Sequence, residues 1–222
     1  MNTTIVKQLI LKDWHFLRGP IIGYLAGGAV ALLLIATGSE GGFFAGLVVL
    51  ITVLISVGIH LAMTTVVGER KEQTLPFVMS LPISYMEYTT AKILANLLIF
   101  LIPWSAILIA ALALFTIGNA GGVIPFMVLV VTYLFAAYTL LLAVAIVSES
   151  QSWAVGAMVF GNLVLQAFFY GITHNPSVAR TMKGHAAVWS PTAVTILAVE
   201  IALILLLLGG TFYFQARKKD FI

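Results

Sequence analysis

The sequence predicts an all-α membrane protein with six transmembrane helices. Of its 222 residues, 61% are hydrophobic and only 9% are charged, whereas a soluble domain carries about 25% charged residues. The apolar residues form six runs that approach or exceed the roughly 20 residues a helix needs to cross a bilayer. Backbone polar groups in hydrocarbon must pair within the chain, which favours helices, and the short alternating segments of a β-barrel are not seen. We therefore expect a single transmembrane domain over residues 1–222.

The predicted spans follow one another with little chain between them. They cover residues 21–37, 43–67, 93–117, 123–147, 153–173 and 194–214. Three connections, at 38–42, 118–122 and 148–152, are so short that the helices they join must be antiparallel neighbours. The two longer connections are 68–92, predicted to be cytoplasmic, and 174–193, predicted to be external. A short helix within the external connection is a further possibility.

The first residues are expected to lie along the inner surface of the membrane. Residues 1–19 carry apolar side chains at helical spacing, interleaved with charged ones, which is the pattern of an interfacial helix. Trp14 would lie at the level of the headgroups. Gly19-Pro20 is expected to break this helix and to turn the chain into the first span. The alternative is that these residues are a solvated start to that span.

The basic residues predict that both ends of the chain are cytoplasmic. Cytoplasmic flanks of membrane proteins carry an excess of Lys and Arg. With the N-terminus inside, nine of the 11 basic residues are inside, and only Arg180 and Lys183 are outside. The net charge of +3 therefore reflects orientation in the lipid bilayer, and no nucleic-acid partner is expected. The absence of cysteine excludes disulfides and thiolate metal sites.

The cytoplasmic connection 68–92 combines a charged start with an apolar patch. The patch consists of Leu75, Phe77, Val78, Met79 and Leu81. Apolar side chains on such a connection need the membrane surface, their own bundle or the groove of a partner protein. Ser84 is a candidate N-cap of the helix that follows, with Glu87 three residues later as in a capping box. On the residues alone, docking on a partner and folding back onto the bundle are equally open.

The same connection resembles the signature of ABC type-2 transport permeases. In that family the pattern runs Glu-Arg-x-x-Gly-Thr-Leu, then Ser-Leu-Pro-Ile-Ser, then Glu and Lys. The matching residues here are Glu69-Arg70-Lys71-Glu72-Gln73-Thr74-Leu75, Ser80-Leu81-Pro82-Ile83-Ser84, Glu87 and Lys92. Gln73 departs from the pattern, because the family usually has Gly there. The close match covers about 25 residues, and the six-span layout extends it loosely over the chain.

The resemblance implies the permease subunit of an ATP-driven ABC exporter in the inner or plasma membrane of a bacterium. The connection would contain a coupling helix that docks on a separate ATP-binding subunit. The docking residues would be Glu69, Arg70, Glu72, Thr74, Leu75, Phe77, Met79, Ser80, Leu81, Pro82 and Ser84. Two copies of this chain, or this chain and a related permease, would assemble with two ATP-binding subunits. ATP and Mg²⁺ would bind to those subunits, since this chain has no Gly-x-x-x-x-Gly-Lys-Ser/Thr loop.

Polar residues also recur inside two of the predicted spans. They are Thr52, Ser56, His60 and Thr64 in the second span, and Asn162 and Gln166 in the fifth, each four residues from the next. Residues four apart form one ridge on a helix. In the family, the second and fifth spans tend to line the path between protomers, so the resemblance implies a translocation path along these ridges. The alternative is hydrogen bonding between helices or back to the same helix.

Glu200 is the one carboxylate well inside a predicted span. An isolated charge there is costly, so the group must be protonated, paired or close to water. Arg180, Lys183 and His185 in the external connection are candidate partners. A structural pair with one of them is the simpler hypothesis, and a proton relay is the more specific one.

Two other function classes fit the sequence less well. An intramembrane metalloprotease would need His-Glu-x-x-His, which is absent, so we expect no enzymatic activity and no metal site in this chain. A secondary transporter or channel-like protein working without an ATPase would have helices broken at mid-membrane and paired half-repeats. The predicted spans are mostly uninterrupted, and Pro103 and Pro125 are the prolines inside them. The sequence does not specify the exported substrate.

Overall fold

The computed structural model describes residues 3–69 and 85–217, and the regular elements of these residues are all helical. The long helices are α1 (Thr3–Ala36), α2 (Glu40–Ala62), α5 (Tyr85–Ile117), α6 (Ile124–Ser148), α7 (Gln151–His174) and α9 (Pro191–Ala216). The short elements are η1 (Met63–Gly68), η2 (Gly121–Val123), α8 (Pro176–Ala179) and η3 (Thr181–Lys183). Six helices among the described residues are long and apolar enough to cross a membrane, and each overlaps one of the predicted spans, although the first begins at Val6 and the third at Met86. The prediction of an all-α polytopic membrane protein is confirmed.

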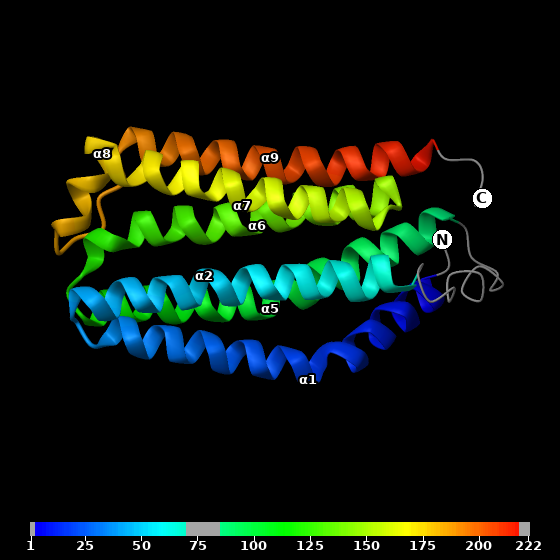
Figure 1. Cartoon of the computed structure of the whole chain (residues 1–222), viewed down its shortest axis with the longest axis horizontal. Coiled ribbons are helices and arrows are strands. Elements are labelled where there is room, and N and C mark those ends of the chain that lie inside the picture. Colours follow the sequence, from blue (N-terminus) through cyan, green and yellow to red (C-terminus); the bar gives the residue numbers. More distant parts are fainter. Residues whose placement is uncertain (1–2, 70–84, 218–222) are drawn as a thin grey trace.

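The predicted break at Gly19-Pro20 is wrong, because α1 continues through both residues. Proline in a helix lacks the N–H that would bond to the carbonyl of Phe16, and its ring crowds that carbonyl. The usual result is a bend, not an end, and Figure 1 shows the N-terminal section of α1 inclined to the rest of the helix. This section packs against the start of α5, where Val6 and Leu9 are buried with Tyr88 and Ala91. Its position at the membrane surface stays a prediction.

Helix α6 forms the centre of the bundle. It packs against α7 and α9 on one side and against α2 and α5 on the other, while α1 packs against α2 and α5. Figure 1 shows the resulting order across the bundle, from α1 through α2 and α5 to α6, and then to α7 and α9. The apolar side chains of α6 therefore enter both large hydrophobic clusters, with Leu142 in one and Val130 in the other.

The turns alternate between the two ends of the bundle (Figure 1). The start of α1, the end of α9 and both edges of segment 70–84 lie at one end, which the basic residues predict to be cytoplasmic and which is called the inner end here. The α1–α2 turn, the α5–α6 turn and α8 lie at the outer end. The external connection packs on the α5–α6 turn, where the Gly122 N–H donates to the Gly184 carbonyl (2.9 Å). A Cβ on Gly122 would lie 2.1 Å from the Thr181 oxygen, so only glycine fits.

Candidate functional site

A buried group of charges joins three helices at the inner end. We call Lys12, Asp13, Glu69, Tyr88 and Lys92 the inner charge cluster. The Lys92 Nζ lies 2.9 Å from Asp13 Oδ2 and 2.8 Å from Glu69 Oε1. Lys12 also pairs with Glu69, and its Nζ lies 3.5 Å from Asp13 Oδ1. The Tyr88 hydroxyl donates to Glu69 Oε2 (3.1 Å). The cluster thus links α1, the residue that follows η1, and the first turns of α5.

The members of the cluster differ in burial. Lys92 is 2% exposed and Asp13 4%, while about half of the Lys12 side chain is exposed. Charges buried to this degree are tolerated only when they are paired and hydrogen-bonded. Among the described residues, two lysines face two carboxylates, so their charges balance, and Lys92 is the member whose charge depends most completely on its partners.

The ionised form of Glu69 is favoured in this setting. Burial alone would raise the pKa of its carboxyl, but the charges of Lys92 and Lys12 and their hydrogen bonds outweigh that effect and lower the pKa from its ordinary value of 4.5. Glu69 is therefore a carboxylate at neutral pH, which is the form that Lys92 requires as a partner.

A polar network continues from the cluster into the bundle. The Asn96 side chain, one turn beyond Lys92, donates to the Lys92 carbonyl (2.9 Å) and to the Thr65 hydroxyl (2.8 Å). Tyr138 on α6 donates to the Asn96 carbonyl (3.1 Å). Thr65 lies in η1, which is a π-helix, a form that is rare and is frequently found at functional sites. The network therefore connects the inner charge cluster to the central helix.

The cluster holds both edges of the predicted docking segment. Glu69 immediately precedes Arg70, and α5 begins at Tyr85. Of the predicted docking residues, Glu69 alone is described. Its carboxylate is engaged by Lys92, Lys12 and Tyr88. The others lie outside the described residues, namely Arg70, Glu72, Thr74, Leu75, Phe77, Met79, Ser80, Leu81, Pro82 and Ser84.

The polar side chains of the second span mainly form hydrogen bonds within the bundle. Thr52 donates to the Val48 carbonyl and Thr64 to the His60 carbonyl, so both hydroxyls bond back to their own helix. The His60 Nδ1 lies 2.8 Å from the Tyr24 hydroxyl of α1, which makes a hydrogen bond between helices. Ser56 is half-buried on the same helix. These contacts match the structural alternative, and a translocation path along this ridge stays a prediction.

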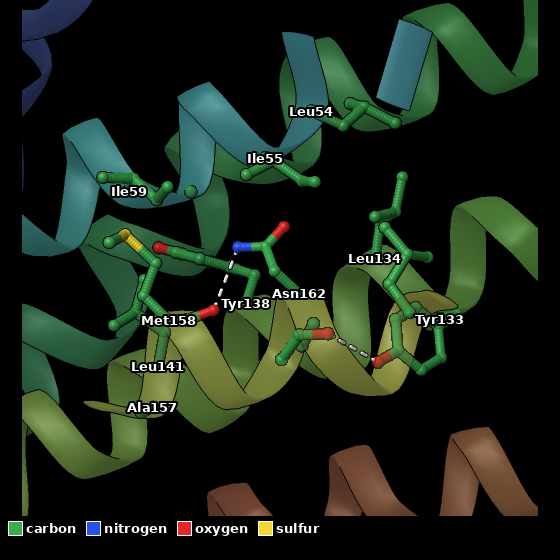
Figure 2. Close-up of a pocket in the computed structure, with 14 residues that line it drawn as sticks. Leu54, Ile55, Ile59, Tyr133, Leu134, Tyr138, Leu141, Ala157, Met158 and Asn162 are labelled. Atoms are coloured by element: carbon green, nitrogen blue, oxygen red, sulfur yellow. Dashed lines mark hydrogen bonds between the residues drawn. The ribbon is translucent and has the colours of Figure 1, made fainter. Parts of the chain in front are cut away.

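A groove runs between α2, α6 and α7 in the middle of the bundle (Figure 2). Its walls are mostly apolar, with Ile55 and Ile59 from α2 and Met158 from α7. Asn162, one of the predicted path residues, rises from α7 toward α2 and donates to the Met158 carbonyl (2.9 Å). Tyr138 lines the same groove. The polar network from the inner charge cluster therefore ends at the groove wall.

Two polar side chains of α7 face outward at the level of the membrane. Asn162 and Gln166 are both exposed in the single chain. Amide side chains are costly in hydrocarbon and normally find a partner on another helix. The second predicted path residue of α7 therefore lies on an uncovered face, next to the groove.

Sequence reasoning identified Glu69 and Lys92 only through the family signature and missed their partners. Asp13 is the only acidic residue of α1, and its isolation in an apolar helix is the signal that could have marked it. No local pattern could have paired it with Lys92, because 79 positions separate them in the chain.

Comparison with known proteins does not assign this chain to a family. No family model matches the sequence, no curated protein matches it, and no solved structure matches the fold. The class that the fold defines is that of α-helical polytopic membrane proteins.

Proposed function

We propose that this chain is the membrane-spanning permease subunit of an ATP-driven exporter. In this proposal a separate ATP-binding subunit, which carries ATP and Mg²⁺, docks on segment 70–84 and drives substrate across the cell membrane. The likeness of residues 69–92 to the permease signature and the six-span fold support it. The observation that carries it is the inner charge cluster, because that cluster ties the two edges of the segment to one another and to α1.

The contacts provide a route for force from the segment to the membrane. A pull on the segment acts on Glu69 and on the first turns of α5. Since Lys92 pairs with both Asp13 and Glu69, α1, η1 and α5 would move together. The hydrogen bond between Tyr138 and Asn96 then couples α5 to α6 and to the groove. Packed elements joined by such networks carry coupling between distant sites.

The exposed amides of α7 favour a complex of two permease chains. A second copy, or a related permease, that covers α7 would remove Asn162 and Gln166 from lipid. The groove between α2, α6 and α7 would then border the path between the two chains.

Co-purification with candidate ATP-binding subunits tests the proposal. Phe77→Ala is expected to weaken retention of the ATP-binding subunit roughly tenfold, as truncation of an aromatic anchor does. Phe44→Ala is the matched control, because Phe44 is 54% exposed near the start of α2, at the outer end of the bundle. Substrate-stimulated ATP hydrolysis by the complex would support the proposal. Transport by this chain alone, in vesicles with no ATPase, would replace it with the secondary-transporter alternative.

Cross-linking tests the two-chain arrangement. The chain has no cysteine, so Asn162→Cys creates a single reactive thiol. A short bis-maleimide is expected to link two copies of this variant in membranes. Leu98→Cys is the control, since Leu98 is 52% exposed at a similar depth on α5. Equal yields of linked dimer from the two variants would contradict a specific contact through α7.

A further inference from the structure

Glu200 is a buried carboxyl group without a partner in the described part of the chain. It is 5% exposed, and neither of its oxygens has a hydrogen bond. It belongs to a set of buried α9 residues spaced alternately seven and four apart, namely Ala193, Glu200, Ile204, Thr211 and Gln215. This spacing places them on one helix face, and α6 is the main neighbour of α9. Glu200 therefore faces the protein interior, not lipid.

The predicted ion pair with the external connection is not formed. His185 Nδ1 instead bonds to the Asn119 carbonyl (2.9 Å). The ion pairs among the described residues all lie in the inner charge cluster. Arg180 and Lys183 flank or belong to η3 at the outer end, whereas Glu200 lies nine residues into α9. The pairing prediction fails because the carboxyl is deeper than the loop side chains reach.

The depth of Glu200 favours its neutral form. Nine residues of helix span roughly 14 Å, which is about half of a hydrocarbon core of roughly 30 Å. An ionised carboxylate without a partner is strongly disfavoured at this depth, whereas a carboxylic acid carries no net charge and brings its own donor.

One titratable side chain lies opposite Glu200 on the packed helices. Tyr133 on α6 lies nine residues from the outer end of its helix, as Glu200 does on α9, and the two helices pack against each other. The α8 residues contain no titratable group, and the titratable α5 residues Glu87, Tyr88 and Lys92 belong to the inner end.

Tyr133 also connects this position to the groove. It lines the groove and donates to the Gly161 carbonyl of α7 (2.9 Å), as Figure 2 shows. A phenol oxygen that donates one hydrogen bond keeps lone pairs with which to accept another. Tyr133 therefore borders the groove, and its free lone pairs can accept a hydrogen bond from a Glu200 acid that turns toward it, although no such bond is formed in the structure.

We propose that Glu200 is a proton-binding site within the membrane, which exchanges its proton with the groove by way of Tyr133. The bound species is a single proton, and its loss leaves a carboxylate that requires water or a cation in its place. An ATP-driven exporter does not require such a site, so the inference goes beyond the proposed function. It holds equally if the chain works without an ATPase.

Labelling with dicyclohexylcarbodiimide tests the bound proton directly. This apolar reagent adds to protonated carboxyl groups inside membranes, and mass spectrometry locates the adduct. In vesicles at about pH 7, Glu200 is expected to be labelled at least about tenfold more than Glu40, an exposed carboxyl at the outer end. Glu200→Gln should lose the adduct. If Glu200 is unlabelled even at about pH 6, the proposal is wrong.

Infrared spectroscopy tests the role of Tyr133. The difference spectrum of the wild type and Glu200→Gln is expected to contain the C=O band of a carboxylic acid at neutral pH. Tyr133→Phe keeps the ring that stacks on Phe168 but removes the hydroxyl, so the shift of this band in deuterated buffer, which reports exchange of the Glu200 proton, should become at least about tenfold slower. An unchanged exchange rate in Tyr133→Phe overturns the exchange route through Tyr133, and the absence of the band in the wild type overturns the site. Neither measurement depends on an ATP-binding subunit, so its failure is distinct from failure of the proposed function.

Discussion

Replacement of Lys92 by methionine is expected to destabilise the protein by about 3–5 kcal/mol. Methionine fits the space of the lysine stem but leaves Asp13 and the inward-facing Glu69 without their buried partner. Removing one member of a buried ion pair costs far more than the pair contributes, because the remaining charge stays desolvated. Equilibrium unfolding in mixed detergent micelles measures the loss.

Lys12 provides the matched control. It contacts the same two carboxylates, but half of its side chain is exposed to solvent, so Lys12→Met is expected to cost only about 0–1 kcal/mol. Adding Asp13→Asn and Glu69→Gln to Lys92→Met removes the uncompensated charges and should restore most of the stability. Equal losses from the two lysine variants, or no recovery in the triple variant, would contradict the cluster as described.

The cluster also changes how the docking segment should be tested. From the sequence, charge reversal at Glu69 is expected to uncouple transport without unfolding the bundle. In the structure, a lysine at this position would face Lys92 and Lys12, and like charges buried together destabilise the fold. Loss of transport in that variant would therefore not distinguish docking from folding. Phe77→Ala is the more specific test of docking, because Phe77 is not a member of the inner charge cluster.

The number and apolar character of the spans could be predicted from the sequence because they depend on the bilayer alone. The start of the first membrane helix could not be predicted from the sequence. Pro20 removes one hydrogen bond from α1, but the helix continues on both sides of it, and its N-terminal section is stabilised by the packing of Val6 and Leu9. The polar periodicity of the second span predicted a single ridge, and this stays a prediction. Which way that ridge faces depends on Tyr24, a residue on another helix.

The charged residues show more clearly that contacts between distant parts of the chain cannot be predicted from local sequence. Sequence spacing marked Glu200 as unusual, but its partner was predicted from proximity in the chain, and the structure places those candidates at a different depth. Lys92 and its two partners, Asp13 and Glu69, come from three parts of the chain that only tertiary packing brings together. Long-range pairings of this kind are specified by helix packing, not by local pattern.

Replacement of Gly46 by leucine is expected to destabilise the bundle by about 3 kcal/mol or more. A Cβ at Gly46 would lie 2.5 Å from the Ala31 carbonyl oxygen and 2.9 Å from the Ile35 nitrogen. Both atoms belong to the backbone of α1, which cannot move aside as a side chain can. The two helices would have to separate, which would open the packing around Leu47 and Leu50.

Gly23→Leu is the control for this prediction. It distinguishes the loss of the close contact at Gly46 from the general effect of replacing a glycine in a helix. No atom lies within 4 Å of a Cβ built on Gly23, so the substitution is expected to raise stability by up to about 1 kcal/mol through helix propensity. The two variants add the same side chain to membrane helices and should shift the unfolding midpoint in opposite directions. A similar shift for both would mean that α1 and α2 do not approach as closely at Gly46 as the structure shows, and that the bundle order starting from these two helices must be revised.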